Sequence, residues 1–301
     1  MRDGVGGVSS TARRIAFRAL RWSGLPFIVR RTLQRRKVTL IAYHEIDPPT
    51  LDAHLRELGR RYTFITLRDF ADARCRGRFT DLPNRALAVT LDDGLASQYA
   101  LLDVFRKHAV RPTIFLTAGV VGTNRRFWWT VPTRPKEFVA LRDMPDDERL
   151  AALVLQGYSE TADAPGRPSS LTRAQIEEMR PFVDFQAHTM FHPVLARCSN
   201  DRSRFEIYES KKRLQEDLSL DIYAFAYPNG KANDFTERDV AYVSQAGYEC
   251  AVTAQLGFND GATSLYRLKR IVMMDDASAE EAVVQASGVS TYLKRLLAAS
   301  E

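Results

Sequence analysis

The sequence predicts an α/β protein, a distorted (β/α)7-type barrel with a basic helical segment in front of it and an insertion of loops and helix after the third strand. Seven short β-branched or aromatic runs alternate with helical patterns, which is the order of parallel strands connected by helices. The chain has 301 residues, 45% of them hydrophobic, which suffices for one barrel of about 250 residues with additions. This composition excludes a disordered or collagen-like chain.

Each predicted strand is a short run that can be buried on both faces. The strands are expected at residues 38–43, 86–91, 113–117, 182–187, 222–227, 249–253 and 266–273. Amphipathic helices are expected between them, at residues 51–61, 67–74, 97–108, 204–218 and 237–246. Residues 38–301 are therefore predicted to form one domain of the barrel type.

One interval breaks this alternation, at residues 119–168. It has no clear strand but contains five prolines, the aromatic run at 127–129 and a helical pattern near 146–156. An irregular insertion of about 50 residues in a compact domain is usually functional rather than a linker. We expect it to form a loop or lid.

The segment at residues 1–37 is strongly basic. Ten basic residues and one acidic residue precede Glu45, although the net charge of the whole chain is only +6. Its uncharged apolar stretch at 22–29 is far shorter than the roughly 20 apolar residues of a spanning helix. Apolar residues interleaved with arginines over 11–37 predict an amphipathic segment on an anionic membrane surface. The alternative is a basic helix that only packs on the barrel. No nucleic-acid partner is expected, because no recognised DNA- or RNA-binding motif accompanies the positive charge.

The three cysteines, Cys75, Cys198 and Cys250, are far apart and form no CxxC pair. They support neither a disulfide framework nor a zinc knuckle. The interrupted apolar run near the start also argues against a secretory signal. We therefore expect a cytoplasmic protein, peripheral on the inner face of the membrane.

Two groups of metal-ligand residue types follow predicted strands. Asp92 and Asp93 lie directly after the strand at 86–91, and His188 and His192 follow the strand at 182–187. Histidines four residues apart in a helical turn share a face and suit a divalent ion together with a carboxylate. An Asp-Asp-Gly turn or a pair of loop histidines alone is a weak signal, but their joint position at strand ends favours a metal site.

A third motif occupies residues 225–230, again at a strand end. Its residues Tyr227, Pro228 and Asn229 lead into a Pro-Asn-Gly turn. Such a turn can aim backbone N–H groups at a developing oxyanion. On its own it is only a turn.

Together, TLDDG at 90–94, HTMFHP at 188–193 and FAYPNG at 225–230 resemble the motifs of the polysaccharide deacetylase family, the NodB-homology carbohydrate esterases of family 4. The resemblance covers about residues 38–275. The segments IAYHEI at 41–46 and RLKRIV at 267–272 resemble the corresponding segments of family members associated with exopolysaccharide and capsule synthesis. It implies hydrolysis of N-acetyl groups on the amino sugars of a polysaccharide, oligosaccharide or glycan precursor, with release of acetate.

The resemblance also implies residue roles. Asp93, His188 and His192 would hold a divalent metal, most often Zn²⁺, with Co²⁺, Ni²⁺ and Mn²⁺ as alternatives, and Asp92 would be the general base. Where many members have an arginine that pairs with the base, this chain has Ala226. We expect Arg270, at the end of the chain's last strand, to replace it, because strand alternation turns Lys269 the other way.

The general acid also departs from the family pattern, because the late histidine of many members is missing. His44 is the first candidate and Asp275 the second. Trp128 and Trp129 are candidates for stacking on sugar rings, with a small core inside the insertion as the alternative. His54 and His108 are expected to be solvated.

Two other functions stay open at this point. One is a related metal-dependent amidase or O-acyl esterase, because the metal chemistry is shared. The other is a non-catalytic glycan- or membrane-binding relative, which the missing arginine and late histidine would favour. The intact pair Asp92 and Asp93 and the two motif histidines argue against this last alternative.

Overall fold

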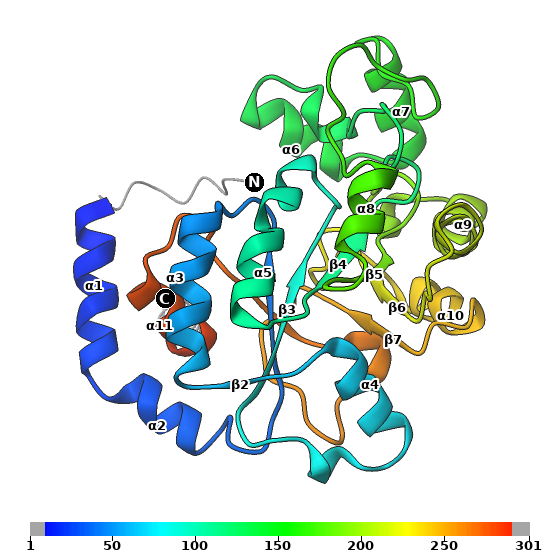
Figure 1. The fold of residues 1–301 in the computed structure, drawn as a ribbon. Helices are drawn as coiled ribbons and strands as arrows, with labels where there is room; N and C mark the ends of the chain where they lie inside the picture. Colours follow the sequence, from blue (N-terminus) through cyan, green and yellow to red (C-terminus); the bar gives the residue numbers. More distant parts are fainter. Residues whose placement is uncertain (1–9, 291–301) are drawn as a thin grey trace.

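The computed structural model describes residues 10–290, and seven of its strands form a nearly closed parallel barrel (Figure 1). Their order around the barrel is β7–β6–β5–β4–β3–β1–β8, and Val252 pairs with Leu268 to bridge the remaining gap. The strands are β1 (Thr39–Tyr43), β3 (Ala86–Leu91), β4 (Thr113–Leu116), β5 (Asp184–Ala187), β6 (Ala224–Ala226), β7 (Cys250–Val252) and β8 (Arg270–Val272). The predicted fold class is confirmed.

Apart from the ends of β5 and β8, the seven barrel strands are buried on both faces, as the continuous apolar runs predicted. One set of side chains fills the barrel interior and includes Leu40, Ala88, Phe115 and Ala226. The other set packs outward against the surrounding helices. An additional two-residue strand, β2 (Thr63–Phe64), pairs with β3 and was not predicted, because two residues carry no readable periodicity.

Helices surround the barrel, and several begin at side-chain caps that the sequence encodes. They are α3 (Pro48–Gly59), α4 (Leu67–Cys75), α5 (Leu102–His108), α8 (Arg173–Met179), α9 (Asn200–Leu218), α10 (Glu237–Gln245) and α11 (Ala279–Ala286). Thr66 with Asp69 and Ser278 with Glu281 form capping boxes at the starts of α4 and α11. The helix expected at 97–108 is split, because residues Ala96–Leu101 form a 3-10 helix before α5.

The basic segment folds into α1 (Ser10–Trp22) and α2 (Leu25–Arg31). Helix α1 packs against α11 at the outside of the molecule. Arg13 fixes this contact through ion pairs with Glu281 at 3.1 Å and Asp276 at 3.3 Å. Within residues 10–290, no helix has both the length and the apolar character needed to cross a bilayer.

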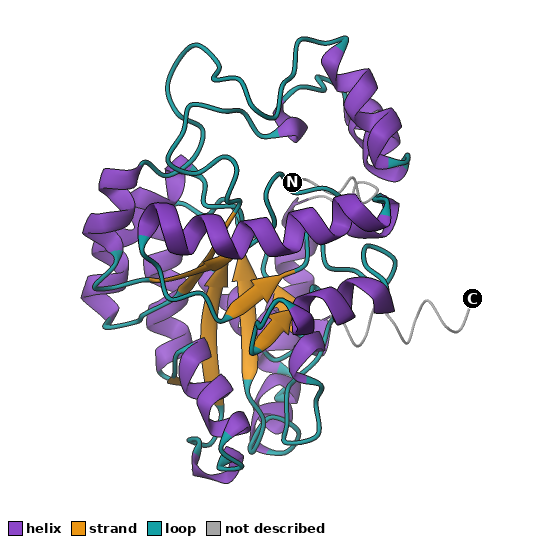
Figure 2. Ribbon diagram, turned by 90° about the vertical axis from the view of Figure 1, so that its right-hand side faces the viewer, coloured by secondary structure: helices purple, strands orange, loops and turns teal. Residues whose placement is uncertain are grey.

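The insertion lies beyond the carboxyl ends of the strands, at the top of Figures 1 and 2. It contains a 3-10 turn at Trp128–Thr130 and the helices α6 (Pro135–Asp143) and α7 (Asp146–Val154). Trp128, Leu141, Leu153 and Tyr158 give it a small core of its own. The insertion is thus a folded cover at the end of the barrel where the three motifs lie.

The expectation for His54 was wrong, because this side chain is fully buried. Its Nδ1 lies 3.0 Å from the hydroxyl of Tyr43, and its Nε2 lies 2.7 Å from the carbonyl oxygen of Ala277. Burial lowers the pKa of His54. The residue therefore joins α3 to the barrel and to the segment before α11 as a neutral hydrogen-bonding group.

Candidate active site

The three motifs meet at the carboxyl ends of β3, β5 and β6. Asp92 and Asp93 follow β3, His188 follows β5, and Asn229 follows β6. In a parallel barrel, neighbouring strands bring such loop residues to the same end. Segments that are far apart in the sequence thereby form one buried polar cluster.

Arg270 is the partner of Asp92. Its Nη1 donates to Oδ1 at 2.6 Å and its Nη2 donates to Oδ2 at 2.7 Å. Burial alone would raise the pKa of Asp92, but the guanidinium of Arg270 outweighs it and holds that pKa well below its ordinary range. Asp92 is therefore an oriented, ionised carboxylate at neutral pH.

The position of Arg270 differs in one respect from the expectation. It is the first residue of β8, level with Leu40 on β1, rather than the last residue of a strand. Its side chain extends inside the barrel, where Nε donates to the carbonyl oxygen of Thr253 at 2.9 Å and Nη1 also donates to Thr90 Oγ1 at 3.1 Å. The side chain of the preceding residue, Lys269, does not contact Asp92 and packs against Gly257.

Asp93, His188 and His192 form the candidate metal centre. Asp93 Oδ1 lies 3.6 Å from His188 Nε2 and 3.5 Å from His192 Nε2, and the three possible ligand atoms lie within 4.8 Å of one another. His188 Nδ1 lies 2.7 Å from the carbonyl oxygen of Ala226, which leaves Nε2 free to bind an ion.

The chemistry of this centre fits a divalent cation. All three side chains are buried, and Asp93 Oδ1 has no hydrogen-bond donor among the described residues. Burial raises the pKa of Asp93, and burial together with His188 lowers that of His192 well below its ordinary value. A buried carboxylate oxygen without a donor beside two imidazole nitrogens is a donor set that zinc-type ions prefer.

The backbone is strained at this site. Among the described non-glycine residues with positive φ are Asp93 at 79°, Thr189 at 62°, His192 at 58° and Asn229 at 57°. Non-glycine residues adopt this left-handed region at an energetic cost, and such residues cluster at functional sites. Here the strain turns two metal-ligand candidates and the turn after β6 toward the same space.

The turn at 227–229 contributes through one residue only. Tyr227 is buried, its N–H donates to Val252 and its hydroxyl donates to the carbonyl oxygen of Tyr266, so neither group is available to a substrate. Pro228 has no N–H. The expectation for these two residues is therefore corrected, since they only shape the turn. The N–H of Asn229 has no acceptor within the described chain and can serve an oxyanion.

His44 lies on the open side of Asp92. Its Nε2 is 3.9 Å from Asp92 Oδ2, and its side chain is 35% exposed. Asp275, the other candidate acid, instead accepts hydrogen bonds from the backbone N–H groups of His44 and Glu45, at 3.4 and 3.1 Å. Asp275 thus holds the loop that positions His44.

The two tryptophans of the insertion have different environments. Trp128 is 1% exposed, stacks on Phe138 and donates its indole N–H to the carbonyl oxygen of His192 at 2.9 Å. Its expected contact with sugar is corrected, because it belongs to the core of the insertion. Trp129 is half-buried, and its ring lies 4.5 Å from the ring of His192. It borders the candidate metal centre.

The sequence analysis missed Glu206 on α9. Its carboxylate is buried and accepts the backbone N–H groups of Met190 and Phe191, at 2.8 and 2.9 Å. Its other oxygen lies 2.8 Å from Arg202, which also pairs with Asp146 and Glu160 of the insertion. Glu206 therefore ties the loop between the two motif histidines to the insertion.

A signal for Glu206 existed, but it was obscured. The buried face of α9 consists of Ser203, Glu206, Ile207, Ser210, Leu214 and Leu218, so polar residues interrupt the apolar stripe. Phe205, the large apolar residue next to Glu206, is instead 40% exposed. An acidic residue at the helical spacing of a buried stripe indicates a paired functional or structural group.

The comparisons with known proteins agree with this geometry. The sequence profile of a family described as polysaccharide deacetylase matches residues 80–251, more than half of the chain. No curated protein matches the sequence.

Solved structures share the fold at low identity. The Streptococcus pyogenes deacetylase PplD, in complex with acetate, has a TM-score of 0.61 at 20% identity over 83% of this chain and 98% of that chain. IcaB from Ammonifex degensii has a TM-score of 0.58 at 20% identity, over 83% and 97%. The BpsB deacetylase domain from Bordetella bronchiseptica has a TM-score of 0.56 at 15% identity, over 79% and 96%.

Proposed function

The chain belongs to the polysaccharide deacetylase family and is a hydrolytic carbohydrate N-deacetylase. From this premise we propose that it uses a divalent metal ion, of the zinc type, to remove acetyl groups from the amino sugars of a glycan. One observation carries the proposal. An ionised Asp92, held by Arg270, lies directly beside a buried cluster of Asp93, His188 and His192 whose carboxylate oxygen Oδ1 has no donor in the described chain.

The residues of the cluster would hold the ion. When bound there, a divalent ion supplies Lewis acidity that polarises the acetyl carbonyl and makes water a better nucleophile at neutral pH. The buried carboxylate of Asp93 supplies negative charge to the ion. The contact between His188 Nδ1 and the carbonyl of Ala226 keeps the ring turned with Nε2 toward Asp93.

Asp92 accepts the proton of the attacking water. Its two hydrogen bonds from Arg270 fix the carboxylate plane, and its low pKa keeps it ionised before the reaction. The N–H of Asn229 donates to the oxygen that gains negative charge as the carbonyl carbon becomes tetrahedral.

His44 donates a proton to the sugar nitrogen. The amine is a poor leaving group until it is protonated, so collapse of the tetrahedral carbon needs an acid on the open side of the site. His44 is half-buried, and its Nε2 lies 3.9 Å from Asp92 Oδ2. The C–N bond breaks, and the products are the free amine on the sugar and acetate.

Acetate release tests this function. The purified protein, loaded with zinc, is incubated with N-acetylglucosamine oligomers, and acetate and free amine are measured side by side. We expect equal amounts of both from the wild type and neither from Asp92→Asn. Release from an O-acetylated sugar but not from the N-acetylated oligomers would replace the N-deacetylase with an O-acyl esterase. Absence of both activities from a metal-loaded, folded protein would contradict the substrate class.

A further inference from the structure

Helices α1 and α2 are fixed to the barrel by one face. Arg13 pairs with Glu281 and Asp276, and Phe17, one helical turn further along α1, is buried. After α2, the buried Gln34 donates to Thr39 Oγ1 and to the carbonyl oxygen of Ala286, both at 2.9 Å. These contacts hold the two helices in a defined orientation, so their opposite face is also defined.

The opposite face is unusually apolar. On α1, the exposed apolar residues Ile15, Ala19 and Trp22 follow the i, i+4, i+7 spacing of a single helix face. Arg18 is exposed on the same face. Ile15 is 64% exposed and Trp22 is 72% exposed. The surface continues over α2 and the following turn through Leu25, Phe27, Ile28 and Leu33, which are 41 to 57% exposed. We call these exposed side chains and their neighbouring arginines the α1–α2 surface.

This surface is also strongly basic. Arg14, Arg18, Arg31, Arg35 and Arg36 are exposed, and no acidic residue occurs between Arg13 and Lys37. Within the described part of residues 1–37, only Arg13 and Lys37 form ion pairs with carboxylates. The guanidinium groups of Arg21 and Arg31 lie 5.6 and 4.9 Å from the ring centres of Trp22 and Phe27. Apolar groups and free positive charges are therefore interleaved.

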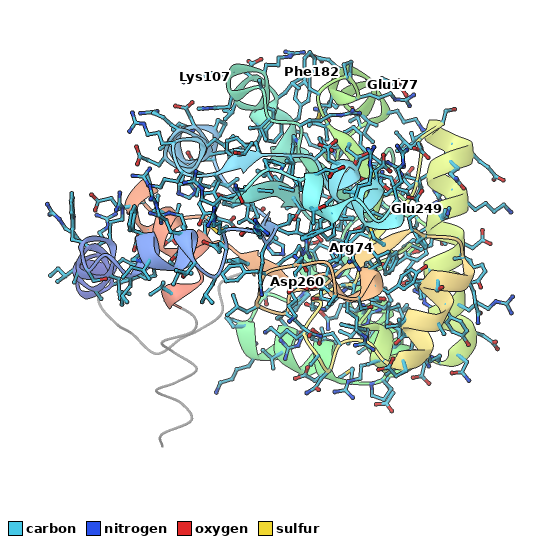
Figure 3. All side chains as sticks on the ribbon, turned by 90° about the horizontal axis from the view of Figure 1, so that it is seen from below. Arg74, Lys107, Glu177, Phe182, Glu249 and Asp260 are labelled. Atoms are coloured by element: carbon cyan, nitrogen blue, oxygen red, sulfur yellow. The ribbon has the colours of Figure 1, made fainter. Side chains whose placement is uncertain are left out.

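We propose that the α1–α2 surface binds an anionic lipid bilayer. Interfacial helices insert aromatic and aliphatic side chains to the depth of the acyl boundary while arginines contact the headgroup phosphates. Figure 3 shows α1 end-on at the edge of the molecule, away from the barrel, where a flat surface can reach it. A second copy of the chain fits less well, because it would place like charges against one another in a contact that buries them.

Vesicle binding tests the proposal with the full chain. Sedimentation with vesicles of phosphatidylcholine containing phosphatidylglycerol should carry the protein down at low salt, and pure phosphatidylcholine should carry much less. Replacing Arg14, Arg18 and Arg31 by Gln should weaken binding roughly 100-fold, since each arginine near an anionic surface contributes a factor of about five. Trp22→Ser with Phe27→Ser should also weaken binding, at unchanged net charge.

A matched control separates the surface from overall charge. Arg76→Gln, Arg78→Gln and Arg167→Gln together remove the same charge from exposed positions elsewhere, and this variant should bind vesicles like the wild type. Equal loss in this control would overturn the proposal, as would a wild type that ignores anionic vesicles. A concentration-dependent dimer that Trp22→Ser and Phe27→Ser abolish would assign the surface to self-association instead. Deacetylation of soluble oligomers should be the same in all these variants, which verifies that they are folded.

Discussion

Arg270 and Asp92 form a two-bond contact in which the planar guanidinium donates to both carboxylate oxygens, at 2.6 and 2.7 Å, across the inside of the barrel. A planar fork of this kind fixes the orientation of a carboxylate as well as its charge. Both side chains are almost fully buried. The contact therefore decides which face of Asp92 is presented to a water molecule beside the candidate metal centre.

Replacing Arg270 should affect the pH dependence as well as the rate. In Arg270→Met, the strongest interaction that opposes the effect of burial would be lost, so the pKa of Asp92 should rise and the acidic limb of the kcat/KM profile should move to higher pH. Arg270→Lys keeps a charge but loses the fork, and we expect a loss of about 10- to 100-fold in kcat. A lower rate with an acidic limb at the same pH as in the wild type would contradict this account.

A relocated arginine provides a control for this prediction. Ala226 faces the barrel interior in the same cluster of side chains as Phe115, and the guanidinium of Arg270 lies 5.7 Å from the ring of Phe115. Compared with Arg270→Ala alone, the double variant Ala226→Arg with Arg270→Ala should therefore recover part of the rate and should move the acidic limb of the kcat/KM profile back toward lower pH. Because the loss of a buried charge partner costs about 3–5 kcal/mol, urea unfolding must first show that each variant is folded.

The pairing of Asp92 illustrates what the sequence could predict. The motifs after the strands at 86–91 and 182–187 indicated which residues would meet, because parallel strands bring their ends together. Ala226 at the expected arginine position directed attention to a cation on the last strand. The sequence could not show that Arg270 begins β8, since the extent of a three-residue strand depends on its partners.

The residues whose environment was predicted wrongly or missed are those whose burial could not be read from the sequence. Trp128 and Trp129 are adjacent and chemically alike, yet one belongs to the core of the insertion and the other borders the site. His54 looked like a surface histidine, but its helix turns it into the core. Glu206 accepts hydrogen bonds from backbone groups of a loop, and although its helical spacing could indicate burial, no residue pattern identifies those backbone partners.

His44→Gln should impair only reactions that need a protonated leaving group. With N-acetylated oligomers we expect kcat to fall about 100-fold or more, because general acid catalysis contributes factors of that order. With an aryl acetate, whose phenolate leaves without protonation, the rate should remain close to that of the wild type. An equal loss on both substrates would show that His44 positions Asp92 rather than donating a proton.

Trp129→Ala should weaken binding of the glycan. Its half-buried ring borders His192, and its removal should raise KM for N-acetylated oligomers about tenfold, which corresponds to about 1.4 kcal/mol. Trp22→Ala, which removes an exposed indole on α1, is the matched control and should leave KM for soluble oligomers unchanged. A loss of kcat in Trp129→Ala without a change in KM would contradict a role in substrate binding.

Glu206 should make stability depend on pH. Asp146, Glu160 and Glu206 surround Arg202, and burial raises the pKa of Glu206 from 4.5 to about 7. The folded protein therefore keeps a proton that the unfolded chain releases above pH 4.5. This contribution to stability is complete below pH 4.5 and is lost as the pH rises through about 7.

Urea unfolding of wild type and Glu206→Gln, without metal, measures this effect between about pH 5 and about pH 8. The free energy of unfolding of the wild type should fall relative to that of the variant as the pH rises, by up to about 1.4 kcal/mol per pH unit. His192 titrates in both proteins, so its effect cancels in the difference. A difference that does not change with pH would contradict the raised pKa.

The most direct test of the central claim is metal content measured together with acetate release, in wild type, Asp92→Asn and His188→Ala. We expect about one divalent ion per chain and acetate from the wild type, the ion without acetate from Asp92→Asn, and neither from His188→Ala. Folding of each variant is verified by its unfolding transition. A folded wild type that binds no divalent ion under any loading condition, or a His188→Ala variant that keeps both ion and activity, would contradict the account.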